Sequence, residues 1–273
     1  MVKDEVDIIN DWINYYGNIF GYENLYIIDN LSTDGTYENI LSFLKKNIHI
    51  NVFRTNYYIN KGVYMKQLIE EYANNECYCF PVDSDEFVVY YDKEKNSIYT
   101  DKKLILQYFE NLPVVNLYKM NYILSLITEP EGYKRATVEC NYGSYLNYGK
   151  EAKSFFRKDL YKGEICHGNH YPNNEYLLTD LCLIHFHHRN LLQMKAKIIN
   201  NVSGLKYDSN NKEQLYKLLN VPYCAGCHHV KNQIEVLENR YKLPFTSKEE
   251  IINNKYINLS IFNQTIPKIK EII

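Results

Sequence analysis

The first 120 residues alternate between two spacings of apolar side chains. Residues 4–20 carry apolar side chains three or four positions apart, which predicts an amphipathic helix. Residues 25–28 form a short apolar run that ends at Asp29, as a buried parallel strand does. The same two patterns predict helices at 37–46, 63–72 and 101–110, and strands at 49–53, 77–82 and 114–120. This alternation is typical of an α/β fold, and we expect a mostly parallel sheet flanked by helices.

The pattern changes twice in the rest of the chain. Residues 121–176 are irregular and rich in Gly, Tyr and Asn, as in an active-site wall or a loosely structured insertion. Helical spacing returns from Leu191 onward, at 191–202, 213–219, 230–241 and 257–273. We therefore expect an α/β domain over residues 1–190 and a helical C-terminal extension over 191–273.

An acidic cluster follows the apolar run at 77–82. Asp83 and Asp85 lie one residue apart, so both carboxylates project to the same side if the backbone is extended. Two such carboxylates repel each other unless a cation lies between them and a partner. Mg²⁺ prefers one or two carboxylates together with phosphate oxygens. Because ligands of open α/β sheets bind at the carboxyl ends of strands, this pair predicts a site for Mg²⁺ or Mn²⁺ and a nucleotide diphosphate. The alternative interpretation is a solvated acidic turn.

Composition narrows the class of protein. The chain has 273 residues, of which 45% are hydrophobic and 23% charged, which is ordinary for a globular protein. A net charge of −2 gives no electrostatic footprint for nucleic acid or an anionic membrane, and no apolar run reaches membrane-spanning length. The start of the sequence is acidic and helix-like, unlike a signal peptide, and seven cysteines make no secreted disulfide framework. We expect a cytoplasmic protein with no nucleic-acid partner.

Five segments together resemble a known family, the family-2-like glycosyltransferases with a GT-A fold. They match its K-[ND]-E, [DN]-[DN]-x-S-x-D-G-T and D-x-D-E-F motifs, followed by a Lys-containing strand and a late His motif. The five segments are Lys3–Glu5, 26–36, 82–87, 153–157 and 185–190. The resemblance covers residues 1 to about 197, and this branch of the family also occurs in large DNA viruses, which would place the protein in the host cytoplasm.

The resemblance implies a GT-A-like catalytic domain and a nucleotide pocket at its N-terminal half. Lys3 and Glu5 would line this pocket. Asp29, with Asn30 nearby, would meet the base, which is usually uracil. The expected donor is therefore a UDP-sugar, and the acceptor a glycan or another hydroxyl compound. Further candidates for nucleotide contacts are Lys61 and Ser84.

The resemblance also implies a metal and diphosphate site. Asp85 would ligate Mn²⁺ or Mg²⁺ directly, and Asp83 would touch the ribose or a metal-bound water. His185 would be a third metal or diphosphate contact, and Lys153 and Arg157 would be cations near the phosphates. The chemistry is coherent, because a metal and basic side chains neutralise the charge that develops on a leaving nucleoside diphosphate.

Alternatives remain open at the level of function. A nucleotidyltransferase also uses paired Asp residues and a metal, and a degenerate site would make the chain a non-catalytic nucleotide- or glycan-binding module. An inverting glycosyltransferase needs a carboxylate base near the acceptor. The sequence does not rank the candidates, which are Glu129, Glu131, Asp159 and Asp180.

Cysteine and histidine clusters are weaker candidates. Residues 224–229 contain C-x-x-C-H-H, which matches haem attachment or soft zinc ligands, but reduced cysteines at a helix start are the preferred interpretation. Cys166, His167 and His170 are possible metal ligands together with His185 or His187. His185 is the favoured one because it ends an apolar run at 181–184, whereas His187 and His188 are at even odds.

Overall fold

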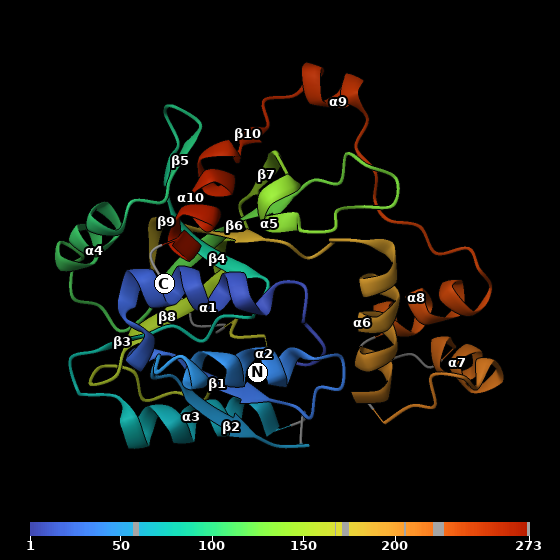
Figure 1. The fold of residues 1–273 in the computed structure, drawn as a ribbon, viewed down its shortest axis with the longest axis horizontal. Coiled ribbons are helices and arrows are strands. Elements are labelled where there is room, and N and C mark those ends of the chain that lie inside the picture. Colours follow the sequence, from blue (N-terminus) through green and yellow to red (C-terminus); the bar gives the residue numbers. More distant parts are fainter. Residues whose placement is uncertain (57–59, 167, 171–174, 205, 221–226, 272–273) are drawn as a thin grey trace.

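The computed structural model describes residues 1–56, 60–166, 168–170, 175–204, 206–220 and 227–271 (Figure 1). Its N-terminal part is a small parallel layer. Strand β1 (Tyr26–Asp29) pairs with β2 (Asn51–Arg54), and Asp29 lies opposite Arg54. Helix α3 (Lys61–Tyr72) covers one face, where Tyr72 contacts the rings of Tyr26 and Phe53. The other helices of this part are α1 (Ile9–Phe20), the short 3₁₀ helix η1 (Tyr22–Asn24) and α2 (Thr36–Lys45).

A larger mixed sheet forms the centre of the protein. Among the described residues its strand order is β10-β7-β6-β9-β4-β5, and β8 pairs with both β6 and β3. Its strands are β3 (Tyr78–Cys79), β4 (Glu86–Asp92), β5 (Ser97–Tyr99), β6 (Tyr118–Ser125), β7 (Tyr142–Leu146), β8 (Lys153–Arg157), β9 (Leu177–His185) and β10 (Ile257–Asn258). The helices within this part of the chain are α4 (Lys102–Glu110), α5 (Ala136–Glu139) and the 3₁₀ helix η3 (Gly149–Glu151).

The α/β class expected from the sequence is confirmed, but the expectation of a mostly parallel sheet is wrong. In the described part of the chain only β1–β2 and β6–β9 are parallel, while β4 pairs antiparallel with both β5 and β9. The reason is loop length: β4 reaches β5 through a turn over residues 93–96, far shorter than the crossover that parallel strands need. The segment 121–176, expected to be irregular, supplies most of β6, all of β7 and β8, and α5.

One apolar core joins the sheet to helices from both ends of the chain. Tyr15 of α1, Phe87 of β4 and Phe262 of α10 (Ser260–Glu271) are fully buried and in ring contact with one another. A cavity of about 440 Å³, lined mainly by apolar side chains of α1, β1, α3 and the β3 segment, lies between the small parallel layer and the large sheet. The end of the chain therefore returns to the main core, although most of the described chain after Leu191 is helical, as expected.

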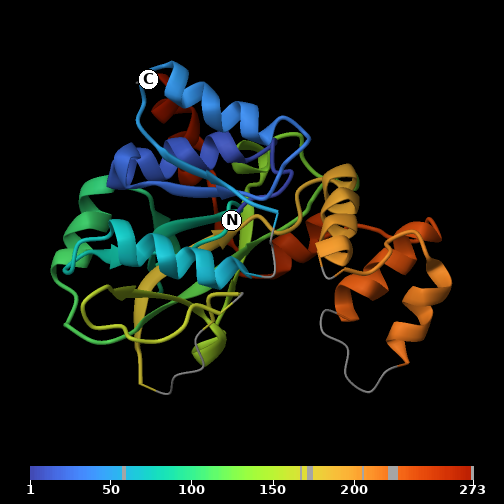
Figure 2. The same ribbon diagram turned by 90° about the horizontal axis from the view of Figure 1, so that it is seen from below.

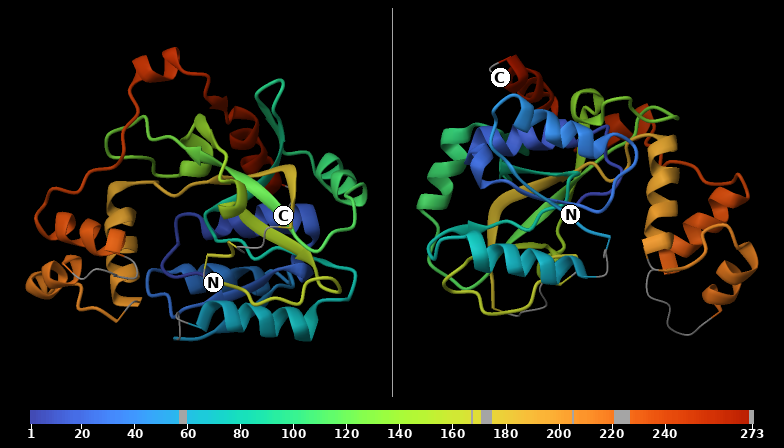
Figure 3. Two further views of the ribbon diagram at one scale, coloured as in Figure 1. Left: turned by 180° about the vertical axis from the view of Figure 1, so that it is seen from behind. Right: turned by 60° about the horizontal axis from the view of Figure 1, so that its bottom comes forward.

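Three helices form a group beside the sheets. Helices α6 (Leu191–Gly204), α7 (Lys212–Leu219) and α8 (Cys227–Leu237) stand apart in Figures 2 and 3. They enclose a small core of Val202, Leu215, Val230 and Ile234. The chain then passes through α9 (Lys248–Asn253), which begins with a capping box at Ser247, before reaching β10 and α10. None of the helices in the described ranges combines the length and the apolar character of a membrane-spanning segment.

Packing of α10 gives a stability prediction. Phe262→Ala is expected to lower the free energy of unfolding by about 3–5 kcal/mol, because it removes a fully buried ring and leaves a cavity. Urea denaturation measures the loss. The control is its neighbour Ile261, which is 47% exposed and whose replacement by alanine should cost much less. Equal losses in the two variants would show that α10 is not part of the main core.

Candidate active site

The acidic turn between β3 and β4 is held from three sides. The Asp83 backbone N–H donates to Oε2 of Glu86 at 2.8 Å, and the Glu86 N–H donates to the Asp83 carbonyl at 3.1 Å. The indole N–H of Trp12 donates to the same carbonyl at 3.1 Å. These bonds fix the turn at residues 83–86, immediately before β4, so that the carboxylates of Asp83 and Asp85 are placed by the backbone.

Strand pairing brings His185 to this turn from about a hundred residues away. β4 and β9 are antiparallel, with Glu86 opposite His185, and the Phe186 N–H donates to the Asp85 carbonyl at 2.8 Å. As a result, Nε2 of His185 lies 3.6 Å from Oδ2 of Asp85. The apolar run at 181–184 is a strand ending at His185, as the sequence predicts.

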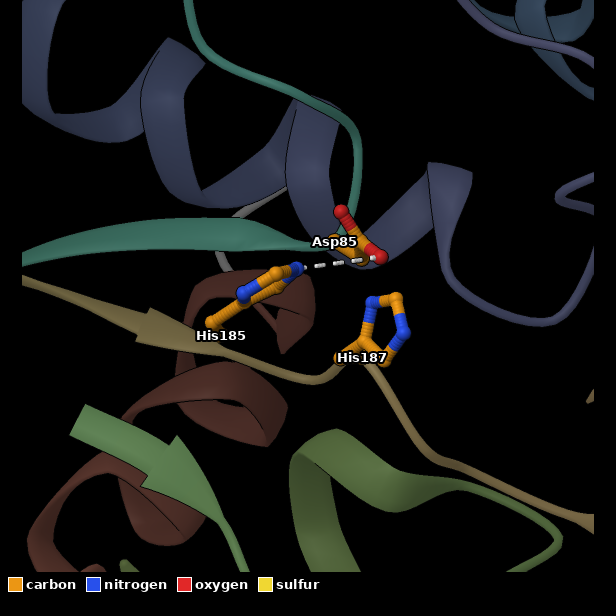
Figure 4. A group of neighbouring side chains, drawn as sticks. All are labelled: Asp85, His185 and His187. Carbon is orange, nitrogen blue, oxygen red and sulfur yellow. Dashed lines mark ion pairs between the residues drawn. The ribbon is translucent and has the colours of Figure 1, made fainter. Parts of the chain in front are cut away.

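Asp85, His185 and His187 form a group with the geometry of a metal site. One ligand atom from each lies within 4.8 Å of the other two, and Figure 4 shows both imidazoles turned towards the Asp85 carboxylate. Burial lowers the pKa of His187 well below its ordinary value, and the nearby charges of Lys197, His185 and His188 lower it further. His187 is thus neutral, which is the form that ligates a metal. One carboxylate and two imidazoles are a ligand set for a divalent metal ion.

Asp83 faces two lysines rather than this group. Its Oδ1 lies 2.5 Å from Nζ of Lys61, and its Oδ2 lies 2.9 Å from Nζ of Lys153. Lys153 also lies 2.9 Å from Oε2 of Glu86. Burial opposes the charge of Asp83, but the two ammonium groups hold its pKa far below the ordinary value. Asp83 therefore stays ionised and holds the ammonium groups of Lys61 and Lys153 beside the acidic turn.

Lys61 reaches Asp83 because the start of α3 packs tightly. The Cα of Gly62 touches the backbone at Ile165, and a Cβ at that position would lie 1.9 Å from the Ile165 carbonyl oxygen. The Lys61 side chain is consequently buried at the turn. The absence of a side chain at Gly62 thus allows the Asn60–Gly62 segment to lie close to Ile165 and beside the acidic turn.

A second ionic cluster surrounds Asp85. Arg189, only 1% exposed, binds Glu5 and Asp7, with Nε 2.8 Å from Oδ2 of Asp7. Its NH1 lies 3.7 Å from Oδ2 of Asp85, and Nζ of Lys197 lies 2.6 Å from the same oxygen. Burial would raise the pKa of Asp85, but the charges of Lys197, His185 and Arg189 keep it well below the ordinary value.

The first two sequence motifs are joined by hydrogen bonds. The N–H groups of Asp4 and Glu5 donate to Oγ of Ser32 and Oγ1 of Thr36, at 3.0 and 2.8 Å. In return, Oδ1 of Asp4 accepts from the Thr33 N–H at 2.7 Å. Lys3 donates to the Leu31 carbonyl, and the Asn30 N–H donates to the Val2 carbonyl. These bonds attach residues 3–5 to the loop after β1, and this attachment places Glu5 beside Arg189.

Asp29 lies at the end of β1, as expected, and is fully buried. Its carboxylate accepts from the Ser32 N–H at 3.2 Å and pairs with Nε of Arg54 at 3.0 Å. The Arg54 guanidinium also lies over the ring of Tyr37, 4.0 Å from its centroid. The end of β1 thus combines a carboxylate, a guanidinium and an aromatic face.

Some predicted residues are not brought to the acidic turn. Arg157 lies at the far end of β8 from Lys153 and pairs with Asp159 at 2.7 Å, while Asp180 pairs with Lys93 at the other end of β4. The 129–131 loop, in contrast, lies beside Arg189, since Gly132 bridges to Asn190 and the Leu191 N–H donates to the Glu131 carbonyl. Ser84 is buried within the turn itself.

Among the weaker Cys and His candidates that the structure describes, His187 belongs to the group, whereas Cys166, His170 and His188 do not. His167 and residues 224–226 lie outside the described residues, as does the side chain of Cys227. In the described part of the chain, the group of three residues that could hold a metal ion consists of Asp85, His185 and His187. Cys166 and His170 instead hydrogen-bond each other through the cysteine sulfur and the histidine backbone.

Four charged residues of the site are not predicted by the sequence patterns: Asp7, Glu86, Arg189 and Lys197. Glu86 and Arg189 lie inside the motif segments 82–87 and 185–190. A charged residue within two positions of Asp85 or His187 is therefore a sequence signal that could have identified them. Lys197 is one of two lysines on α6, and nothing in the helical pattern separates it from Lys195. Only the packing of α6 against the site distinguishes them.

Comparison with known proteins shows a distant likeness to a solved structure. No protein-family model matches the chain, and no curated protein matches it. Among solved structures, the crystal structure of S. aureus TarS is similar with a TM-score of 0.34 and 13% sequence identity. The match covers 88% of this chain and 42% of TarS, so the chain spans less than half the length of that protein.

Proposed function

We propose that this chain is a metal-dependent glycosyltransferase of the GT-A-like type, which moves a sugar from a nucleotide-sugar donor to a glycan or another hydroxyl acceptor. One observation carries the proposal: a metal-ligating group of Asp85, His185 and His187 lies directly beside a cluster of buried cations. A site for a metal and a diphosphate needs both parts, because phosphate oxygens complete the coordination of the metal and basic side chains bind the remaining charge.

In the proposed reaction, side chains of the acidic turn and its neighbours would bind the metal and the diphosphate. A divalent ion held by the Asp85 group would supply neutralisation of the charge on the departing nucleoside diphosphate. Lys61 and Lys153 both pair with Asp83, and with 7% and 1% of their side chains exposed they supply buried positive charge for a diphosphate bound beside this turn. Asp83 and Glu86 keep Lys153 charged, because they raise its pKa above the ordinary value although burial opposes this.

For the acceptor base we propose the loop at 129–131. Glu129 and Glu131 belong to the segment that bridges to Asn190, next to Arg189, whereas Asp159 and Asp180 are engaged elsewhere by Arg157 and Lys93. A base has to come within hydrogen-bond reach of the acceptor hydroxyl at the site of transfer. The loop at 129–131 meets this requirement better than Asp159, which follows β8, or Asp180, which lies within β9.

Asp29 gives a prediction for nucleotide binding. Asp29→Ala is expected to weaken UDP binding by about 1–3 kcal/mol, the cost of losing a hydrogen bond to a buried polar group. Isothermal titration with UDP and Mn²⁺ measures the change. Asp92→Ala is the control, since Asp92 pairs with Lys95 in the β4–β5 turn at the opposite end of β4. Unchanged UDP affinity in Asp29→Ala would remove this residue from the pocket.

The function itself is tested with a panel of nucleotide sugars, nucleoside diphosphates and nucleoside triphosphates in a thermal-shift assay, with and without Mn²⁺. A ligand that binds the folded state raises the melting temperature, by an amount set by its concentration relative to its Kd. We expect the largest rise with a UDP-sugar and Mn²⁺ together, followed by donor turnover. Preferential stabilisation by a nucleoside triphosphate would point to nucleotidyl transfer, and binding without turnover to a non-catalytic module.

A further inference from the structure

The site contains a cation that no part of the proposed reaction requires in its present place. Lys197 extends from α6, and its Nζ lies 2.6 Å from Oδ2 of Asp85. This is the same oxygen that faces Nε2 of His185 at 3.6 Å. The Lys197 ammonium therefore contacts the carboxylate oxygen that points into the metal-ligating group.

An ammonium and a divalent metal cannot both use that oxygen in this arrangement. A metal–oxygen bond of about 2.0–2.2 Å would place the metal within a few ångströms of Nζ, where the two positive charges repel strongly at low dielectric. Lys197 is largely buried, with 19% of its side chain exposed, so water screens this repulsion poorly. One of the two cations has to leave Oδ2 of Asp85.

A second carboxylate is available to receive the ammonium. Oε1 of Glu5 lies 3.7 Å from Nζ of Lys197, while the other oxygen of Glu5 binds Arg189. A shift of the lysine side chain by a few ångströms would exchange Asp85 for Glu5 without exposing the charge to an apolar environment. The exchange needs no movement of the strands that carry Asp85 and His185.

We propose that Lys197 is a built-in counter-ion of the metal site, which neutralises Asp85 in the metal-free protein and is displaced from it when the metal binds. The inference rests on the proposed metal dependence. It makes Lys197 a positioning residue: it holds the Asp85 carboxylate in place before the metal arrives, and it lowers the metal affinity by competing for the same oxygen.

The displacement also connects the metal to the helical group α6–α8. Polar contacts tie α6 to the acidic side of the site: Lys197 pairs with Asp85 and Glu5, and Nδ2 of Asn200 donates to Oδ2 of Asp4 at 2.9 Å. Of these, the contact of Lys197 with Asp85 is the one that a bound metal would replace, and α6 would stay attached through Glu5 and Asp4.

The test measures Mn²⁺ binding alone by isothermal titration, with no donor and no activity assay. Lys197→Met is expected to bind Mn²⁺ about ten-fold more tightly than the wild-type protein, because the competing charge is gone. Lys195→Met is the matched control, since residues two apart on a helix point in nearly opposite directions, and it should leave the affinity unchanged. Lys197→Arg keeps the charge and should stay close to wild type.

Each outcome decides the matter. Wild type and Lys197→Met binding Mn²⁺ with equal affinity would overturn the displacement while leaving metal dependence intact, and weaker binding by Lys197→Met would do the same. No Mn²⁺ binding by any variant would overturn both this inference and the metal requirement of the proposed function. If melting curves show that Lys197→Met does not fold, Lys197→Gln, which still donates a hydrogen bond to Asp85, takes its place with the same expected direction.

Discussion

Asp85→Asn is expected to reduce turnover of the nucleotide-sugar donor by about 100- to 1,000-fold, the range found when a charge-stabilising group is removed from an active site. Asp85 is 3% exposed and is the only carboxylate in the metal-ligating group of the described residues. Its amide analogue has nearly the same shape but no charge, so the loss would fall on metal and diphosphate binding. Steady-state kinetics over a range of Mn²⁺ concentrations measures the effect.

The control for this variant is Asp92→Asn, which makes the same chemical change at the other end of β4, where Asp92 pairs with Lys95. Its turnover should match the wild type. Melting curves of both variants separate loss of activity from loss of fold. Near-normal turnover of Asp85→Asn in saturating Mn²⁺ would contradict the assignment of the metal site.

The parts of the site that the sequence anticipated are those set by short-range chemistry. The loop after β1 and the acidic turn before β4 are both defined by neighbouring residues, through hydrogen bonds such as those of Asp29 with the Ser32 N–H and of Asp83 with Glu86. The geometry of such motifs is determined by hydrogen bonds between residues close in the sequence. The α/β class is similarly accessible, because alternating strand and helix patterns constrain how layers pack.

His185 shows how far this reasoning reaches. Its position at the end of an apolar run indicated a strand end, but only the antiparallel register of β4 and β9 places it next to Asp85. The sequence favoured a mostly parallel sheet, since buried strands in both kinds of sheet are apolar runs. The register depends on contacts between residues 86–90 and 181–185, which no local pattern encodes.

Lys197 and Arg189 could not be predicted as site residues from the sequence. A charged residue on a helix or after a strand usually faces solvent, and its burial here depends on how α6 and the 186–190 segment pack against the acidic turn. The return of α10 to the main core is comparable: its helical pattern was visible, but its contact with Tyr15 and Phe87 joins the two ends of the chain. These features follow from tertiary packing alone.

Arg189→Met is expected to cost about 3–5 kcal/mol of folding stability, the penalty for removing one partner from a buried ion cluster. The guanidinium binds Glu5 and Asp7, lies near Asp85 and donates to the Phe186 carbonyl at 3.2 Å. Methionine has a similar length but no charge, so three carboxylates would lose their shared cation. Burial already raises the pKa of Glu5 above its ordinary value, and loss of Arg189 would raise it further.

That shift fixes the sign of the pH dependence. A carboxyl whose pKa is higher in the folded than in the unfolded state favours folding when it is protonated, and this advantage is lost as pH rises through the folded pKa. The loss of unfolding free energy in Arg189→Met should therefore be larger at pH 8 than at pH 5. Urea denaturation at each pH measures this loss. Arg240→Met, which removes a 60% exposed partner of Glu238, is the control and should cost about 0–1 kcal/mol at both pH values. If the Arg189→Met deficit were equally small, or independent of pH, the cluster of Glu5, Asp7 and Asp85 would not depend on Arg189 for its charge balance.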